Sequence, residues 1–184
     1  WLAADKITGL ENTDPVTTWI NAGTGANFIQ ATANQKPLYM TSIVNSLPIV
    51  RFDGSNDNLT SASGLTLEQP SSFYVVSQRT GNTSAYNRIC WVAGDAGEAG
   101  YNNLVDSWYL YAGTVLTRAA TDNAFHILTG ILNGASSTVR TDAAATAGAA
   151  GAGSWSNSTV FLGHVADSPL AGDIAELFVF SGLH

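Results

Sequence analysis

The sequence predicts an all-β fold, a two-sheet antiparallel β-sandwich of the jelly-roll type. Short apolar or alternating runs recur along the whole chain, separated by Gly, Asn, Asp, Ser or Pro, which is the pattern of strands joined by turns. About a dozen such runs occur with no long amphipathic helix between them, and this combination is typical of antiparallel sandwiches and jelly rolls.

The predicted strands follow one another at short intervals. In chain order they are Val16–Ile20, Leu38–Met40, Pro48–Phe52, Leu65–Leu67, Ser72–Gln78, Arg88–Ala93, Ser107–Ala112, Val115–Arg118, Phe125–Leu132, Ser137–Thr141, Thr159–His164 and Asp173–Phe180. Some carry apolar residues on both faces, as Phe73-Tyr-Val-Val76 does. We expect such strands in the middle of a sheet, where both faces are covered.

The least regular segment, Ala143–Ser154, is built of small residues. A helix here is costly because Gly148, Gly151 and Gly153 each lower helix stability by ~1 kcal/mol. We predict a short strand followed by a flexible loop, with no domain boundary. Residues 1–184 are therefore expected to form one domain, and the opening on Trp1 without a leader sequence indicates a processed product or a fragment of a longer chain.

Composition and charge exclude several classes of partner. Only 11% of the residues are charged, against about 25% in an average soluble domain, which is typical of extracellular, cell-surface or virion β proteins. The net charge is −7, and the seven Lys and Arg residues are scattered singly. Nucleic acids and anionic membranes both attract clustered cations, so neither is expected as a partner. The chain contains no stretch of ~18 apolar residues, so no membrane span is predicted.

The single cysteine, Cys90, excludes an internal disulfide. It lies in the apolar run Ile89–Val92, where a cysteine usually acts as a small buried hydrophobic residue. We expect Cys90 in the core.

The segment Leu47–Leu59 reads as a strand, a tight polar turn and the start of a second strand. Ile49, Arg51 and Asp53 lie on one face of the expected strand and Val50 and Phe52 on the other, and Gly54 can adopt the positive φ that a tight turn needs. Asp53 and Asp57 can accept hydrogen bonds from nearby main-chain amides. We interpret the segment as a corner that joins two strands.

Three separated blocks resemble the laminin-G-like, concanavalin-A-like lectin jelly rolls of a bacterial and phage branch. The blocks are Trp1–Asp5 with Val16–Gly23 and Ala31–Tyr39, then Arg51-Phe-Asp-Gly-Ser-Asn-Asp-Asn-Leu59, and last Phe125–Leu128 with Phe161–Gly163 and Gly172–Phe180. Together they span nearly the whole chain. The family often has a carboxylate where this chain has Ala3, and it often continues into a C-terminal helix beyond the last block.

The resemblance implies a calcium site at the rim of the sheets. Carboxylate and carbonyl oxygens suit this hard cation, and the candidate ligands are Asp53 and Asp57, with Asn56 or Asn58. The alternative is that the same side chains only stabilise the turn by accepting hydrogen bonds from main-chain amides.

Catalysis is not expected. Glucanases on this sandwich use two glutamates on one strand face, whereas the glutamates here are isolated and form no Glu-x-Asp-x-Glu motif. Asp173 and Glu176 are three positions apart, which predicts opposite faces of a strand. His126, His164 and His184 show no metal-ligand spacing and no neighbouring acidic residue.

The strand Ser107–Ala112 supplies the first ligand-binding candidates. Alternation places Trp108 and Leu110 on one face, and Tyr109 and Tyr111 on the other. If the first pair faces the core, the two tyrosines are exposed side by side. Flat aromatic rings can stack on the apolar faces of sugars, as in a lectin groove.

Further candidates lie in nearby polar segments. Tyr101 and Asn103 precede the aromatic strand, and Trp155 follows the small-residue loop. The alternative is that all these rings complete the core or an intersubunit contact.

The sequence thus favours a non-catalytic module that binds a glycan or cell-surface polysaccharide, or mediates adhesion, in an extracellular or phage virion protein. The main alternative is a structural virion domain that decorates or assembles with other proteins. A glycoside hydrolase is a distant third hypothesis.

Overall fold

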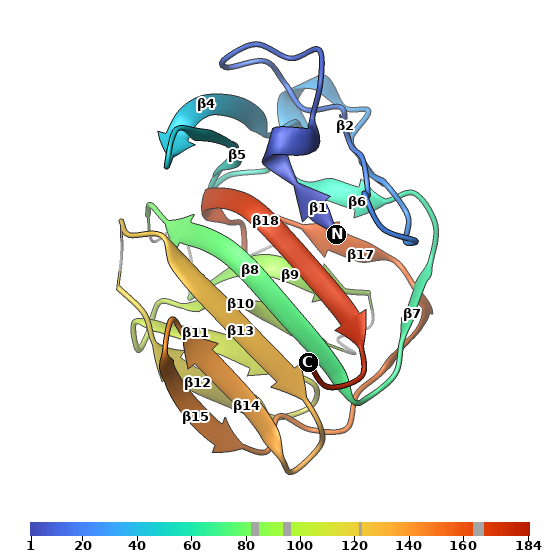
Figure 1. The fold of residues 1–184 in the computed structure, drawn as a ribbon, viewed down its shortest axis with the longest axis vertical. Coiled ribbons are helices and arrows are strands. Elements are labelled where there is room, and N and C mark those ends of the chain that lie inside the picture. The colour runs from blue at the N-terminus through green and yellow to red at the C-terminus, as the bar shows by residue number, and fades with distance from the viewer. Residues whose placement is uncertain (82–84, 94–96, 122, 164–167) are drawn as a thin grey trace.

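The computed structural model describes residues 1–81, 85–93, 97–121, 123–163 and 168–184. Two large antiparallel sheets stack as a sandwich (Figure 1), so the predicted all-β jelly-roll architecture is confirmed. Two short 3-10 helices, η1 (Ala4–Lys6) and η2 (Ala33–Gln35), complete the N-terminal part. Within the described residues, no helix is long and apolar enough to span a membrane.

Sheet A is the layer in front in Figure 1. In spatial order it consists of β15 (Ala144–Gly148), β14 (Ser137–Thr141), β13 (His126–Leu132), β8 (Ser71–Arg79), β18 (Ala171–Ser181), β5 (Leu47–Asp53) and β4 (Leu38–Val44), with β1 (Leu2–Ala3) paired to β18. The long strands β8 and β18 form its centre.

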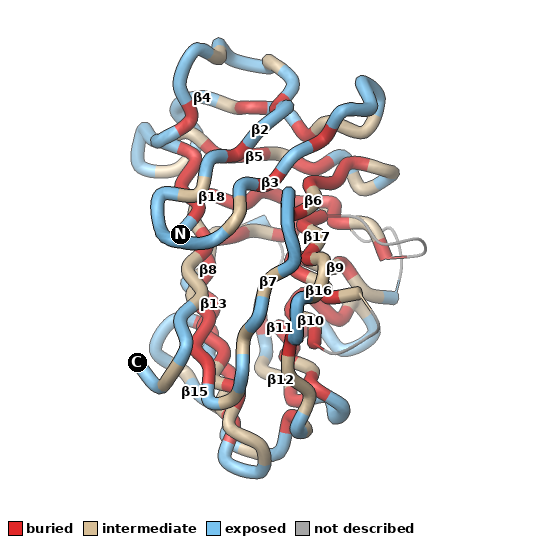
Figure 2. The backbone as a smooth tube through the Cα atoms, turned by 90° about the vertical axis from the view of Figure 1, so that its right-hand side faces the viewer, coloured by how far each residue is buried: buried red, intermediate tan, exposed pale blue. Residues whose placement is uncertain are grey.

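Sheet B is the layer behind. In spatial order it consists of β12 (Val115–Ala119), β11 (Ser107–Tyr111), β10 (Glu98–Asn102), β9 (Tyr86–Val92), β17 (Val160–Leu162), β6 (Leu59–Ser61), β3 (Phe28–Ile29) and β2 (Thr18–Trp19). Figure 2 shows how a third, two-stranded sheet of β7 (Leu65–Leu67) and β16 (Trp155–Ser158) closes one side of the sandwich.

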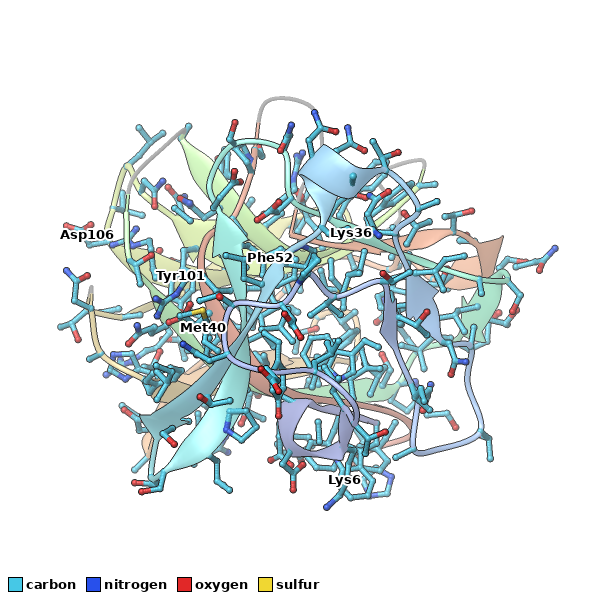
Figure 3. The ribbon with its side chains drawn as sticks, turned by 90° about the horizontal axis from the view of Figure 1, so that it is seen from above. Lys6, Lys36, Met40, Phe52, Tyr101 and Asp106 are labelled. Atoms are coloured by element: carbon cyan, nitrogen blue, oxygen red, sulfur yellow. The ribbon has the colours of Figure 1, made fainter. Side chains whose placement is uncertain are left out.

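The core fills the space between the two sheets. Trp19, Trp108 and Leu128 have no exposed surface, and Phe52 lies in the interior of the molecule (Figure 3). Fully burying one large apolar side chain stabilises a fold by roughly 1.5–3 kcal/mol. Cys90 belongs to the same core cluster, as expected, and burial raises the pKa of its thiol to about 12.

The segment Leu47–Leu59 is a corner between the two sheets. It leaves sheet A at the end of β5 and enters sheet B at β6. Phe52 packs so closely against Gly163 that a Cβ on this glycine, whose φ is +90°, would lie 2.2 Å from Phe52 Cδ1. The corner is therefore locked against β17 as well as along its own chain.

Most strands lie where alternation places them. The small-residue segment 143–154 contributes the short strand β15 at the edge of sheet A, which confirms a strand followed by a loop. Strand β10 was not predicted, because Glu98–Asn102 contains few apolar residues. The described part of the predicted strand Thr159–His164 contains β17, and His164 itself lies outside the described residues.

Candidate functional site

The aromatic strand β11 has the two faces that its alternation predicts. Trp108 and Leu110 belong to the core between the sheets, whereas Tyr109 and Tyr111 are outside that core cluster. Tyr109 and Tyr111 therefore project from the outer face of sheet B. This face is the first candidate site.

A row of directly paired residues crosses the outer face of sheet B. Tyr111 on β11 pairs with Glu98 on β10, and Glu98 pairs with Trp91 on β9. Trp91 in turn pairs with Phe161 on β17. Directly opposite residues in antiparallel strands share a face, with their Cβ atoms roughly 4.5–5.5 Å apart. The four side chains thus form one row, named here the Tyr111–Phe161 row.

The row combines half-buried aromatic rings with a charged pair. The rings of Trp91 and Phe161 lie 5.1 Å apart at 44°, and both side chains keep part of their surface exposed. Between them and Tyr111, the Glu98 carboxylate accepts a hydrogen bond from Arg88 Nε. Flat apolar surface and fixed polar groups therefore stand side by side on this face.

Tyr109 is not exposed, which corrects the expected pair of exposed tyrosines. Its side chain has no accessible surface, because it packs over Gly100 and meets the Tyr86 ring edge-on, with the two ring centres 5.3 Å apart. A Cβ on Gly100 would lie 3.1 Å from Tyr109 Cε1. Burial, and then the negative charge of Glu98, raise the pKa of Tyr109. Tyr111 keeps partial exposure.

Tyr101 does not reach the surface as expected, whereas Asn103 keeps part of its surface exposed and stays a candidate. Tyr101 is fully buried; it lies inside the molecule in Figure 3, and its hydroxyl donates to the carbonyl of Ser77 in sheet A. The guanidinium of Arg79 lies 5.5 Å from its ring centre. Asn103 accepts a hydrogen bond from Arg79 and donates one to Asn87. Both residues join the sheets at one end of the sandwich.

Trp155 is also buried, at 3% exposure, and does not stand in an open loop. It lies in β16, and its ring meets that of Phe73 edge-on at 5.3 Å. The physical reason is that β16 pairs with β7 across the open side of the sandwich, which turns the indole inward.

The side chains of Asp53 and Asp57 stabilise the corner. Asp53 Oδ1 accepts from the amides of Ser55 at 2.8 Å and Asn56 at 3.2 Å, while Asp57 Oδ2 accepts from the amide of Asp53 at 3.0 Å. Burial and the nearby Asp53 charge raise the pKa of Asp57 to about 6. Within the described residues, no group of three or more His, Cys, Asp or Glu side chains is placed to hold a metal. The calcium site stays a prediction.

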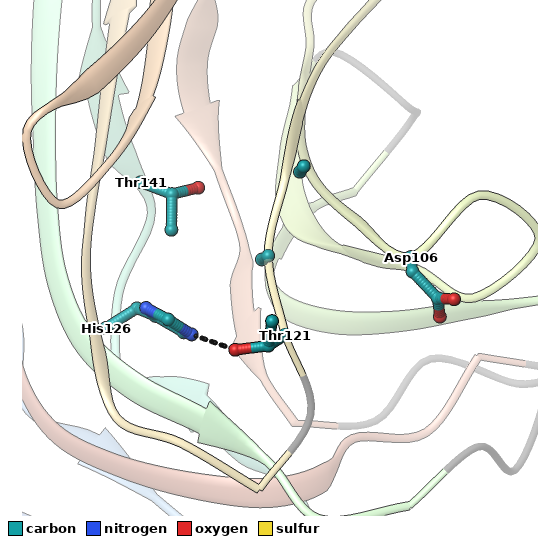
Figure 4. A pocket seen from close by; sticks show the side chains of 6 residues that line it. Asp106, Thr121, His126 and Thr141 are labelled. Atoms are coloured by element: carbon teal, nitrogen blue, oxygen red, sulfur yellow. Dashed lines mark hydrogen bonds between the residues drawn. The ribbon is translucent and has the colours of Figure 1, made fainter.

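An opening of about 470 Å³ lies beside His126 (Figure 4). His126 Nε2 lies 3.0 Å from Thr121 Oγ1, and His126 Nδ1 lies 2.8 Å from Asp142 Oδ2. The expected absence of an acidic neighbour is therefore wrong, because the β14–β15 turn brings Asp142 to the start of β13. The His126 hydrogen bond and the Ile127 amide lower the pKa of Asp142.

The order hydroxyl–imidazole–carboxylate can activate a nucleophile, but the same atoms also hold a turn. Asp142 has a φ of 54°. Its Oδ1 accepts from the amide of Ile127 at 3.0 Å, and its own amide donates to the carbonyl of Ile127 at 2.8 Å. These contacts fasten the β14–β15 turn to β13, which explains the arrangement structurally.

Asp173 and Glu176 share a face of β18, so the expected opposite orientation is wrong. Their partners on β8, Gln78 and Val76, are two positions apart, and the strand bulges between Ile174 and Glu176. The Asp173 carboxylate binds Arg51 through two hydrogen bonds of 2.7 and 2.9 Å. Asp173 thus joins the corner strand β5 to the last strand.

The sequence did not identify the most important members of the outer face. Trp91 was part of an apolar run, Phe161 part of a family-like block, and Glu98 an isolated glutamate. Only the pairing of β9, β10 and β17 brings these positions together. The alternation of Trp91 with Cys90 and Val92 was the one local signal for an outward-facing tryptophan.

No family model and no curated protein matches the chain. Several solved structures share its architecture, including these two. A Trypanosoma rangeli sialidase in complex with sialic acid superposes with a TM-score of 0.63 at 9% identity over 95% of this chain. Domain 4 of an extracellular arabinanase from Geobacillus stearothermophilus, in complex with arabinotriose, gives 0.62 at 12% identity over 84% of this chain and 77% of that one. The chain spans 30% of the length of the sialidase. At these identities the likeness shows a shared β-sandwich fold.

Proposed function

We propose that this chain is a non-catalytic glycan-binding module, and that the outer face of sheet B is its binding surface. The observation that carries the proposal is the Tyr111–Phe161 row, in which half-buried rings flank a fixed Arg–Glu pair. Sugar rings have apolar faces that stack on aromatic side chains, and hydroxyls that need directional partners. The row offers both within one stretch of sheet.

The glycan is proposed to be neutral. The chain carries a net charge of −7, which repels polyanions at a distance. Within the row the only acidic side chain, Glu98, is already paired with Arg88, so its remaining lone pairs are suited to hydroxyl donors. The arabinanase domain, solved with arabinotriose, is consistent with a sandwich of this shape serving a neutral sugar.

The setting is proposed to be an extracellular, cell-surface or virion protein that uses the module for adhesion. The low content of charged residues supports this, as does the resemblance of the Leu47–Leu59 corner to laminin-G-like jelly rolls. Calcium at Asp53 and Asp57 is part of the same proposal.

A protein-binding function is the second candidate, and a different face favours it. Trp1 and Phe180 lie on the outside of sheet A and are 40% and 39% exposed. Phe178 stacks between them, with ring centres 5.4 Å from Trp1 and 6.1 Å from Phe180. Exposed apolar patches of this kind mark protein contacts.

The test is a glycan array on the native chain with and without EDTA, followed by titration of the best neutral oligosaccharide. Removing two central aromatic anchors costs at least about 2 kcal/mol of binding, or roughly thirtyfold in Kd. The variant Trp91→Ala/Phe161→Ala should show this loss. The matched control Phe178→Ala/Phe180→Ala on sheet A should bind within twofold of the native chain.

Two results would contradict the proposal. One is an array on which no glycan binds the native chain, together with concentration-dependent self-association. The other is a loss of binding in the sheet A control with full binding in the sheet B variant. Loss of binding in EDTA, restored by added calcium, would support the proposed ion.

A further inference from the structure

A cavity of about 560 Å³ lies between the two sheets, separate from the outer face of sheet B. It is bounded by β1 and β18 of sheet A and by β3, β9 and β17 of sheet B. The two-stranded sheet of β7 and β16 covers its side, where β7 crosses between the layers (Figure 2). Cavities that hold small molecules have volumes of roughly 300–1,000 Å³, so this one is large enough for a ligand.

The walls of the cavity are apolar. They are formed by Leu2, Phe28, Leu65, Leu67, Cys90, Trp155, Val160, Leu177 and Val179, and the exposed rings of Trp1 and Phe180 also line the cavity. Among the described residues that line it, none carries an ionisable side chain other than the Cys90 thiol. A charged group inside such walls would lose its hydration without gaining a partner, so a ligand must be uncharged where it is buried.

The polar side chains that line the cavity are those of Asn21, Thr24, Thr66 and Ser181, together with the indole of Trp155. The hydroxyl-bearing residues Thr24, Thr66 and Ser181 are exposed where the cavity meets the surface. Inside, Trp155 is 3% exposed, and its indole Nε1 has no hydrogen-bond partner in the described part of the chain. An unpaired buried donor costs about 1–3 kcal/mol; this one lies beside Gly97, where an added Cβ would be 2.5 Å from Nε1.

An empty cavity of this kind is unfavourable for the fold. Its lining atoms lack the dispersion contacts that a filled core provides, and apolar cavities neither hold water well nor exclude apolar guests. Filling it with an apolar molecule restores those contacts.

We propose that the sandwich binds a second ligand between its sheets, an uncharged amphipathic molecule with an aliphatic body and a hydroxyl head group. The aliphatic body lies against Phe28, Leu67 and Val160. The hydroxyl lies among the polar residues of the mouth, near Thr66 and Ser181. This site is independent of the proposed glycan surface.

The first experiment uses the native chain and the uncharged fluorophore N-phenyl-1-naphthylamine, displaced by 1-octanol, 1-nonanol and 1-decanol. Burial of a methylene contributes about 0.8 kcal/mol, so each added carbon should tighten competition about fourfold. Decanoate and decyltrimethylammonium should compete at least tenfold more weakly than 1-decanol. A fluorophore that does not bind saturably, or a series without dependence on chain length, overturns the proposal.

The second experiment fills the cavity with a side chain. Leu67→Trp places added volume on the half-buried strand β7, and Leu104→Trp is the control, because Leu104 is 72% exposed and lies outside the cavity lining. With unchanged cooperative thermal unfolding, Leu67→Trp should weaken fluorophore binding at least tenfold, and the control less than twofold. Equal binding by a folded Leu67→Trp overturns the proposal. If this variant does not fold, the alcohol series on the native chain decides.

The glycan variant separates the two proposals. Trp91→Ala/Phe161→Ala should bind the fluorophore as the native chain does, since neither residue lines the cavity. Loss of fluorophore binding in that folded variant would show that the probe occupies the outer face of sheet B, and would overturn the cavity site.

Discussion

The outer faces of the two sheets use similar residues in different arrangements. Each carries aromatic rings and one Arg–carboxylate pair. On sheet A, the Asp173 carboxylate has no exposed surface, whereas Arg51 is 37% exposed. On sheet B, both members of the pair keep some exposure, with 21% for Arg88 and 12% for Glu98. Only the guanidinium is accessible in the sheet A pair, whereas both the guanidinium and the carboxylate keep exposed surface in the sheet B pair.

The aromatic rings on the two outer faces differ in their orientation. Along β18, Trp1, Phe178 and Phe180 are nearly parallel, at 11° and 9° to their neighbours, so their faces are turned toward one another. On sheet B, Trp91 and Phe161 meet at 44° in a row that also contains Glu98. The two faces are therefore alike in composition and differ in the orientation of their rings and in the access to their polar groups.

The largest expected effect is on the sheet A ion pair. Arg51→Ala leaves the buried Asp173 charge without its main partner, and breaking such a pair costs about 3–5 kcal/mol of unfolding free energy. Chemical denaturation measures it, with the exposed Arg140→Ala as the control. Arg88→Ala should cost less, because the carboxylate that it leaves behind, Glu98, is 12% exposed and stays partly hydrated. An equal loss for Arg51→Ala and Arg88→Ala would contradict the contrast between the faces.

A smaller effect is expected for Glu98→Gln in the row. A hydrogen bond to a charged group contributes about 1 kcal/mol more than one to a neutral group, so the Kd for the array-selected oligosaccharide should rise about fivefold. Calorimetric titration measures this. Glu176→Gln on β18 is the matched control, and a similar loss of binding in that variant would place the sugar on the wrong face.

The corner that joins the two sheets predicts a pH effect. The pKa of Asp57 is raised to about 6 from an ordinary value of 3.8, so the folded chain holds this proton more tightly than the unfolded chain. Its contribution to stability is therefore greatest below about pH 4 and declines as the pH rises to about 6. Asp57→Asn should remove this decline in denaturation curves measured across that range. A native-minus-variant difference that is constant with pH would refute the assignment.

The smallest effect is expected for Tyr109→Phe. Because the Tyr109 ring has no exposed surface, the loss of its hydroxyl should leave oligosaccharide binding within twofold. Stability should change by about 1 kcal/mol or less. A loss of binding comparable to that of Trp91→Ala/Phe161→Ala would mean that Tyr109 contacts the sugar after all.

Much of the fold could be predicted from local sequence patterns. Alternation identified β11 and the faces of Trp108 and Tyr109, and the turn residues around Gly54 identified the corner between β5 and β6. These features depend on neighbours in sequence. The strand β10 was missed because Glu98–Asn102 contains only two core residues, Ala99 and Tyr101, among polar residues and a glycine.

The site depended on contacts that no local pattern encodes. Trp91, Glu98, Tyr111 and Phe161 come together only through the register of four strands. The burial of Tyr109 depends on the missing side chain of Gly100 across the strand pair. The shared face of Asp173 and Glu176 depends on a single bulge, which reverses the alternation that predicts opposite faces.

Backbone and side-chain chemical-shift mapping of the native chain, titrated with its array-selected neutral oligosaccharide, tests the glycan proposal most directly. Saturable shifts should gather on β9, β10 and β17, with the Trp91 indole among the largest. Signals from Phe178 and Phe180 on β18 should stay unchanged. Shifts that gather instead on β8 and β18, or no saturable shift at millimolar sugar, would contradict a glycan site on the outer face of sheet B.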